Sequence, residues 1–356
     1  MIVVKVGTNV LSNGDGAIDT ITTGGLVQQI SGLKSQGEQV ILISSGAVGS
    51  GKQVISPTSD ALTSVEKRQL WAAVGQPRLL NYYMQQFSKY DIHVAQILAT
   101  KEDFRDRKHY LHMRNCFKAL LNENVIPIVN ENDVIAVDEL MFTDNDELAS
   151  LVASMMGARA LYILTNVDGV FKGDPSEKGA ELIREINADS QSEIEFKADL
   201  KSSFGRGGMA TKYRMSKRLA SMGIDVFIAN GKRPGILEEI HQGTGIFTRF
   251  VRHQNVSSVK KWIAHQDKSV VATVVINDGA KEVLLREDRA ASLLPIGILK
   301  VEGNFSKGDL INIMDQEKNI IALGRVQYGV ESLQKYIGLP GQKALVHYDY
   351  LVLNRI

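Results

Sequence analysis

Short runs of apolar, mostly β-branched residues recur along the first two thirds of the chain. Most are continuously apolar rather than alternating, which is typical of strands covered on both faces of a parallel sheet. The pattern predicts strands over residues 2–6, 39–43, 93–98, 125–129, 160–164 and 225–228.

Between these runs, apolar residues recur at helical spacing. The clearest case extends from Leu26 to Leu33, with Thr22 and Thr23 as candidate N-caps. Further helices are predicted over residues 67–87, 110–122, 145–155, 209–220 and 234–241. Gly75 and Pro77 are expected to kink or split the first of these. The alternation predicts a three-layer, mainly parallel α/β domain over residues 1–259.

The pattern changes after residue 259. Short strand candidates then alternate with turn sequences such as Asn277-Asp278-Gly279. The strands are predicted over residues 269–276, 297–301, 310–314 and 320–326. This part of the chain, residues 268–350, is therefore expected to form a small β-rich second domain.

Composition excludes several classes of protein. The 356 residues are 44% hydrophobic, which is ample for a large core. The 41 Lys and Arg nearly cancel the 40 Asp and Glu, so no overall field attracts nucleic acid or an anionic membrane. Cys116 is the single cysteine, and it forms no metal-ligand spacing with the seven His. No apolar run reaches roughly 18 residues. We expect a cytoplasmic protein with no metal site of its own and no membrane contact.

The end of the first predicted strand carries residues suited to phosphate. Gly7 allows backbone N–H groups to approach an oxyanion closely, and Lys5 adds a mobile positive charge. An inward lysine whose ammonium group reaches solvent would give the same pattern, so Lys5 and Gly7 alone are weak evidence for a phosphate site.

The second predicted strand leads into a segment of small residues. Gly46 to Lys52 has the spacing G-x-x-x-x-G-K of a P-loop, but Gln53 stands where a P-loop needs Ser or Thr to hold the metal ion. No acidic strand end of the Walker-B type accompanies it. We favour a backbone anion-binding turn for substrate or phosphate.

Two clusters of Asn and acidic residues follow, over residues 130–133 and 144–146. Such residues commonly serve in turns and helix caps, and that interpretation stays open for either cluster. Two clusters at strand and helix ends also supply the acceptors that the ammonium group of a small zwitterion needs in a crevice.

A glycine-rich loop, residues 205–208, leads into a predicted helix with Lys212 in its first turn. A helix N-terminus disfavours a cation. The position of Lys212 therefore indicates that an anion lies between its ammonium group and the start of the helix. A surface loop without a ligand is the alternative.

Taken in order, these segments resemble the glutamate 5-kinase family of the amino-acid-kinase superfamily. The resemblance spans nearly the whole chain and rests on residues 4–8, 44–47, 129–133, 144–146 and 207–212. Residues 278–280, 292–297 and 303–305 resemble the PUA domain appended to many bacterial members. The lysine and glycine-rich loops are common to the superfamily, whereas the two Asn/Asp clusters with a PUA-like tail are much more specific.

The resemblance implies ATP-dependent phosphorylation of the γ-carboxylate of free L-glutamate, the first step of proline biosynthesis. It implies that Lys5 and Lys212 neutralise the phosphates and that Asp146 organises them. The implied glutamate-binding residues are Ser45, Gly46, Asp133 and Asn145. The implied nucleotide-binding residues are Lys5, Thr165, Asn166, Arg206, Gly207, Gly208, Met209, Ala210, Thr211 and Lys212.

Two positions depart from the family pattern. Thr143 replaces the usual glycine before Asp144, and Asn166 stands where an aspartate is common. These departures affect the expected substrate affinity and nucleotide contacts. The resemblance also implies Mg²⁺ carried by ATP, a homo-oligomer, and functional coupling to the glutamate-5-semialdehyde reductase that accepts the labile acyl phosphate.

The chemistry agrees with the motifs. A side-chain carboxylate with an ordinary pKa near ~4.3 is already ionised at neutral pH and needs no general base. The reaction instead needs charge compensation, because an anion approaches a polyanionic nucleotide. Lys5, Lys212, the backbone N–H groups of the Gly7 and Gly46 loops and Mg²⁺ would provide it.

Two alternatives remain. Another superfamily member, such as an acetylglutamate, aspartate, carbamate or uridylate kinase, would share the phosphate machinery but differ in the acceptor. An RNA-binding PUA protein with a relic kinase domain is the second alternative. The intact lysines and the near-neutral charge count against RNA binding.

Overall fold

The computed structural model describes residues 1–13, 17–58, 62–136, 142, 144–173, 179–187, 208–253, 270–286 and 291–353. The chain divides into two compact units, Met1–Gln254 and Asn255–Ile356. The predicted domain limits, residues 259 and 268, lie outside the described residues.

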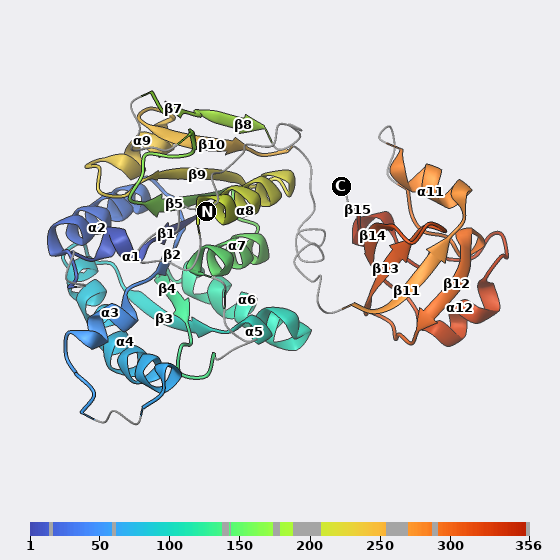
Figure 1. Ribbon diagram of the computed structural model, residues 1–356, viewed down its shortest axis with the longest axis horizontal. Coiled ribbons are helices and arrows are strands. Elements are labelled where there is room, and N and C mark those ends of the chain that lie inside the picture. The colour runs from blue at the N-terminus through green and yellow to red at the C-terminus, as the bar shows by residue number, and fades with distance from the viewer. Residues whose placement is uncertain are drawn as a thin grey trace. The chain divides into compact units, whose positions relative to one another are not determined.

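The first unit alternates strands and helices along the chain (Figure 1). Its elements are β1 (Ile2–Val6), α1 (Thr8–Leu11), α2 (Thr20–Ser35), β2 (Val40–Ser44), α3 (Ala47–Lys52), α4 (Ser64–Ser88), β3 (Val94–Ala99), α5 (Lys101–Arg105), α6 (Arg107–Asn122), β4 (Ile126–Glu131), α7 (Asn145–Met156), β5 (Ala160–Thr165), β6 (Phe171–Lys172), β7 (Glu181–Leu182), β8 (Glu185–Asn187), α8 (Met209–Ser221), β9 (Asp225–Asn230), α9 (Ile236–Gln242) and β10 (Phe247–Val251).

The main sheet has the strand order β3-β4-β2-β1-β5-β9-β10-β8. From β3 to β9 every neighbouring pair is parallel, and β10 pairs antiparallel with β9. Parallel pairing places the carboxyl ends of β1, β2, β4 and β5 along one edge of the sheet. The predicted mainly parallel α/β fold is therefore confirmed.

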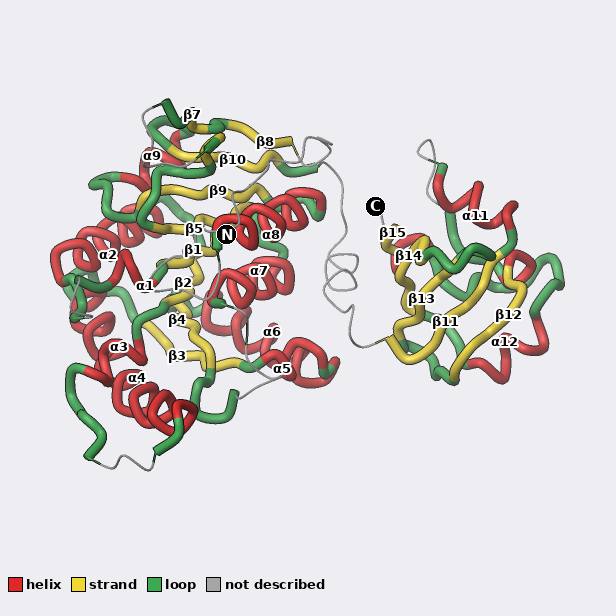
Figure 2. Tube along the Cα trace, in the orientation of Figure 1, coloured by secondary structure: helices red, strands yellow, loops and turns green. Residues whose placement is uncertain are grey.

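Two helical layers cover this sheet (Figures 1 and 2). On one face, buried residues of α2, α4 and α9 share a single hydrophobic core with residues of the central strands. On the other face, α6, α7 and α8 pack against β4, β1 and β9. Burial on both faces explains why these strands are continuously apolar. Within the described part of the chain, no helix combines the length and apolarity needed to cross a membrane.

Helix α4 is continuous from Ser64 to Ser88, so of the predicted kink or split at Gly75 and Pro77 the split is wrong. A proline in a helix interior costs roughly 3 kcal/mol or more through a lost hydrogen bond and a steric clash. The helix is stabilised elsewhere along its length. Thr63 and Glu66 form a reciprocal capping box at its start, and Tyr83 is buried in the core near its end.

Helix α2 is capped by a residue that the sequence pattern did not identify. Asp19, rather than Thr22 or Thr23, is its N-cap, because Asp19 Oδ1 accepts a hydrogen bond from the Thr22 N–H at 3.0 Å. The helix ends at Ser35, and Gly37 follows with φ +88°, in the left-handed region that glycine favours.

The second unit is a five-stranded sheet with its own hydrophobic core, in the order β12-β11-β13-β14-β15. Its elements are β11 (Val270–Ile276), α11 (Asp278–Leu285), η2 (Pro295–Gly297), β12 (Ile298–Gly303), β13 (Leu310–Met314), β14 (Ile320–Arg325), α12 (Val330–Tyr336), η3 (Tyr348–Tyr350) and β15 (Leu351–Leu353). The predicted turn at residues 277–279 is instead a helix start, because Asn277 Oδ1 accepts from the Ala280 N–H at 2.8 Å. The predicted β-rich second domain is confirmed.

Helices α3 and α4 approach closely because each carries a glycine at the contact. A Cβ on Gly75 would collide with the Ala47 carbonyl oxygen, and a Cβ on Gly51 would collide with the Trp71 carbonyl oxygen. Backbone atoms cannot move aside as a flexible side chain can. This contact holds α3, which follows directly from the Ser45 and Gly46 loop, against the core helix α4.

We therefore predict that Gly75→Ala lowers the free energy of unfolding by about 1–3 kcal/mol, because the added methyl group overpacks the contact. Gly25→Ala is the matched control, since nothing lies within 4 Å of the added Cβ in helix α2. It should raise stability by about 0.5–1 kcal/mol through the better helix propensity of alanine. Urea unfolding of both variants measures the effects, and equal effects would contradict this account.

Candidate active site

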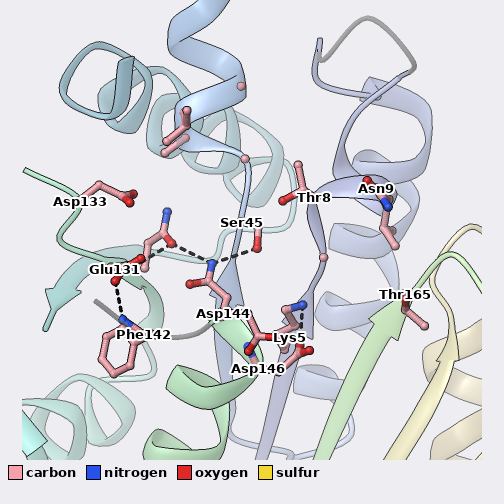
Figure 3. Close-up of a pocket in the computed structure, with 18 of the residues that line it drawn as sticks. Lys5, Thr8, Asn9, Ser45, Glu131, Asp133, Phe142, Asp144, Asp146 and Thr165 are labelled. Atoms are coloured by element: carbon pink, nitrogen blue, oxygen red, sulfur yellow. Dashed lines mark hydrogen bonds and ion pairs between the residues drawn. The ribbon is translucent and has the colours of Figure 1, made fainter. Parts of the chain in front are cut away.

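A cavity of about 400 Å³ lies where the carboxyl ends of β1, β2, β4 and β5 meet (Figure 3). Ligands of open parallel sheets commonly bind at this edge. The cavity is lined by Lys5, Gly7, Thr8, Asn9, Val10, Ser45, Gly46, Ala47, Val48, Gly49, Arg68, Asn130, Glu131, Asp133, Phe142, Asp144, Asn145, Asp146, Thr165, Asn166 and Lys212.

A carboxylate at the base of the cavity joins two lysines from distant parts of the chain. Lys5 Nζ lies 2.6 Å from Asp146 Oδ1, and Lys212 Nζ lies 2.9 Å from Asp146 Oδ2. Lys5 comes from β1, Asp146 from the first turn of α7 and Lys212 from the first turn of α8. Asp146 is 0% exposed. Both ammonium groups are thus fixed on the cavity wall by one buried anion.

The two lysines determine the charge of Asp146. Burial alone would raise the pKa of Asp146, but the charges and hydrogen bonds of Lys5 and Lys212 outweigh it and lower this pKa to about 2. The N-terminus of α7 also favours a negative charge at Asp146. The anion that pairs with Lys212 is thus Asp146 of the protein itself, and the predicted ligand anion at the start of α8 stays a prediction.

The Ser44–Ser45 turn is fixed by a second polar cluster. Asn145 Nδ2 lies 2.9 Å from Ser45 Oγ, 3.0 Å from Asn130 Oδ1 and 3.1 Å from the Ser44 carbonyl oxygen. On the side of α4, the hydroxyl groups of Tyr83 and Ser44 are hydrogen-bonded at 3.0 Å. The side chains of three predicted strand and helix ends therefore meet at one point.

A third cluster lies at the end of β4. Arg68 from α4 contacts both Glu131, at 3.1 Å from Nη2 to Oε2, and Asp133 Oδ1. The other Glu131 oxygen, Oε1, accepts from the Phe142 N–H at 2.7 Å. Burial raises the pKa of both Glu131 and Asp133, and Arg68 opposes that rise.

Asp144 combines a structural contact with a position in the cavity. It caps α7, because its Oδ1 accepts from the N–H groups of Asp146 and Glu147, each at 3.0 Å. Burial and the charge of Asp146 raise the pKa of Asp144, while Lys5 and Lys212 oppose the rise. The helix-cap interpretation therefore applies to Asp144. Its neighbours instead contact other elements of the site, Asn145 through hydrogen bonds to β2 and β4 and Asp146 through the two lysines.

The cavity has two distinct ends. Figure 3 shows Glu131 and Asp133 at one side, Thr165 at the other, and Lys5 with Asp146 between them. At the Thr165 end, the Thr165 hydroxyl group lies 3.3 Å from Asn166 Oδ1.

The structure brings most of the predicted residues to one cavity. Those that line it are Lys5, Ser45, Gly46, Asp133, Asn145, Asp146, Thr165, Asn166 and Lys212. Gly208 is the N-cap of α8, and Met209, Ala210 and Thr211 form its first turn together with Lys212. Arg206, Gly207 and Thr143 lie outside the described residues.

One detail of the glycine-rich turns differs from expectation, and a second agrees with the rejection of a P-loop. The Gly7 N–H donates to the Leu164 carbonyl oxygen at 3.1 Å, so this N–H serves the fold rather than an anion. Lys52, the lysine of the P-loop-like spacing, lies over the Trp71 ring, 4.7 Å from its centroid. It does not line the cavity.

Sequence reasoning missed Arg68 altogether and assigned no role to Glu131. Arg68 lies within a long helical pattern with no motif around it, and its contacts are 63 and 65 residues away in the chain. Glu131 lies in the cluster of Asn and acidic residues at 130–133, where nothing in the pattern distinguishes it from a turn residue. Only the fold shows that these two residues are ion-paired.

Comparison with known proteins identifies the class. The Amino acid kinase family matches residues 1–230, and the PUA domain matches residues 272–346. Because the first match covers more than half of the chain, the chain belongs to the Amino acid kinase family.

Full-length relatives narrow the family further. The chain is 47% identical over 356 residues to the glutamate 5-kinase of Bacteroides thetaiotaomicron, covering 99% of this chain and 98% of that protein. It is 46% identical over 352 residues to the glutamate 5-kinase of Chlorobaculum tepidum, covering 99% and 97%. The resemblance to the glutamate 5-kinase family is thereby confirmed.

Solved structures agree on the fold. Carbamate kinase from Giardia lamblia bound to AMP-PNP superimposes with a TM-score of 0.51 at 19% identity, covering 71% of this chain and 98% of that chain. At this identity the similarity concerns the fold alone.

The buried carboxylate predicts a pH-dependent contribution to stability. The pKa of Asp146 is lower in the folded protein than its ordinary value of 3.8, so its stabilising effect is present above pH 3.8 and is lost as the pH falls through 2. Asp146→Asn should lower the free energy of unfolding by about 2 kcal/mol or more at pH 7.

Urea unfolding of wild type and Asp146→Asn at pH 7 and at successively lower pH tests this expectation. The difference between the two proteins should shrink as the pH falls below about 4. A difference that is the same at every pH would show that Asp146 does not carry a stabilising charge.

Proposed function

We propose that the protein transfers the γ-phosphoryl group of ATP to the γ-carboxylate of free L-glutamate, giving glutamyl 5-phosphate and ADP. A γ-carboxylate oxygen attacks the γ-phosphorus, and the bond from that phosphorus to the bridging oxygen of ADP breaks. The observation that carries this proposal is the buried Asp146 carboxylate, which holds Lys5 and Lys212 on the same cavity wall at 2.6 and 2.9 Å.

The lysine pair addresses the main obstacle to this reaction. Both reactants are anions, so they repel each other until positive charge lies between them. Two fixed ammonium groups supply this charge without reorganisation during the reaction, which is the most effective form of electrostatic catalysis. Because the acceptor carboxylate is already ionised, a catalytic base is unnecessary.

The cavity also suggests how the two substrates lie. Asp133 and the cluster around Asn145 can receive the ammonium and α-carboxylate end of glutamate, so that its γ-carboxylate reaches Lys5 and Lys212. The nucleotide would then enter from the Thr165 end, beside the first turn of α8. Mg²⁺ belongs to the substrate in this proposal, since it is carried by the ATP phosphates.

The catalytic residues of this proposal all belong to the first unit, so we place the catalytic domain at residues 1–259 and a non-catalytic PUA-like domain at 268–350. The product is a labile acyl phosphate. The proposal therefore includes functional coupling to glutamate-5-semialdehyde reductase, which removes that product. It also includes a homo-oligomeric enzyme in the cytoplasm. The family membership favours glutamate over the acceptors of other kinases of this superfamily.

We predict that a panel of acceptors will identify free glutamate. Purified protein with MgATP is offered glutamate, N-acetylglutamate, aspartate, carbamate or UMP, and both ADP release and product formation are measured, with acyl phosphates trapped as hydroxamates. Glutamate should be turned over with the highest kcat/KM. Acetylation should abolish turnover, because the buried carboxylates at the Asp133 end would lose their ammonium partner.

Asp146→Asn serves as the control, since it removes the anion that holds both lysines and should abolish hydroxamate formation. Equal turnover of glutamate and N-acetylglutamate, or turnover of UMP alone, would contradict the proposed function.

A further inference from the structure

Arg68 is a charged residue of the cavity that no sequence motif indicated. It belongs to α4 and reaches the end of β4, where Nη2 lies 3.1 Å from Glu131 Oε2 and also contacts Asp133 Oδ1. Its side chain is 24% exposed, whereas the side chains of Glu131 and Asp133 are each 7% exposed. One guanidinium group therefore bridges two buried carboxylates on the cavity wall.

Two buried carboxylates that contact the same guanidinium group would be unfavourable without this cation. Burial raises the pKa of Asp133, and both burial and the charge of Asp133 raise the pKa of Glu131. Arg68 counteracts both effects by its charge and its hydrogen bonds. An arginine is suited to this position because its guanidinium group stays charged in proteins and has several donors in a rigid plane.

The cluster of Arg68, Glu131 and Asp133 has a net charge of −1 when both carboxylates are ionised. Glu131 and Asp133 contribute two negative charges when ionised, and Arg68 contributes one positive charge. A ligand with a single ammonium group would complete the balance. Arg68 uses only Oδ1 of Asp133 in the contact described, and a carboxylate accepts hydrogen bonds on both oxygens.

We infer that Arg68 is a positioning residue for substrate selection, which holds Asp133 charged and oriented so that its carboxylate pairs with the α-ammonium group of the amino-acid acceptor. This inference rests on the proposed function, because it concerns how the same cavity distinguishes a free amino acid from an N-acylated one. An N-acylated acceptor has no α-ammonium charge, so its binding would leave the cluster one positive charge short.

Helix α4 can perform this role because it is held at other points. The glycine contact of Gly75 with α3 and the hydrogen bond of Tyr83 with Ser44 lie on the same helix as Arg68. Both contacts link α4 to the segment that carries Ser45. The groups expected to bind the ammonium and α-carboxylate end of the acceptor are thus positioned through one helix.

The test compares Arg68→Gln and Arg68→Lys with Arg78→Gln, a control at an exposed arginine of the same helix. We measure kcat and the KM values for glutamate and for ATP. Arg68→Gln should raise the KM for glutamate on the order of 10-fold or more, as expected for the loss of a charged hydrogen-bond partner. Arg68→Lys should give a smaller rise, because it keeps the charge but not the planar donors. The KM for ATP should stay within about twofold, since the nucleotide lies at the other end.

A double-mutant cycle with Asp133→Asn separates action through Asp133 from direct contact with the substrate. If Arg68 acts through Asp133, Arg68→Gln should change the glutamate KM by less than about threefold in the Asp133→Asn protein. A full effect in that background would overturn the inference. An unchanged glutamate KM in the Arg68 variants that fold, or an equal rise in both KM values, would also overturn it.

The same assay distinguishes a failure of the proposed function from a failure of the inference about Arg68. Absence of glutamate turnover by the wild type would contradict the proposed function itself. Normal wild-type turnover with normal Arg68 variants would contradict only the inference about Arg68. If Arg68→Gln does not unfold cooperatively, the Arg68→Lys protein decides the question by its glutamate KM.

Discussion

The rest of the site depends on one interaction, the ion pairing of a fully buried aspartate with two lysines. Asp146 lies in the first turn of α7, while Lys5 and Lys212 come from β1 and α8, so three separate elements must be in place before the three charges meet. The cost of burying a carboxylate is several kcal/mol unless it is paired, and here two ammonium groups pair with it. The same arrangement leaves both ammonium groups on the wall of the cavity.

The parallel sheet makes this arrangement possible. β1 is flanked by β2 and β5, and the carboxyl ends of all three lie on one edge, so short loops from each reach the same cavity. Charge then varies along the cavity. Paired carboxylates and Arg68 lie at one end, lysines lie in the middle, and hydroxyl and amide groups lie at the Thr165 end. This order matches a zwitterion at one end and a polyanionic nucleotide at the other.

The sequence predicted the central strands because their apolar runs are long and regular, and it predicted Lys5, Asp146 and Lys212 because their motifs resemble a family. It did not predict contacts between residues far apart in the chain. Packing that no local pattern contains determines three features. These are the pairing of Arg68 with Asp133, the capping of α2 by Asp19 and the continuity of α4 through Pro77. The helix start at Asn277 was mistaken for a turn because Asn, Asp and Gly serve in both.

The central claim is that the fixed lysines act on the phosphoryl group in transit, and Lys212→Ala tests it most directly. The rate of acyl phosphate formation is measured at saturating MgATP and glutamate, after cooperative unfolding of the variant has been verified. The account predicts a fall in kcat on the order of 10² or more with a much smaller change in the glutamate KM, because the charge matters most in the transition state. A folded Lys212→Ala protein with near-normal kcat would contradict it.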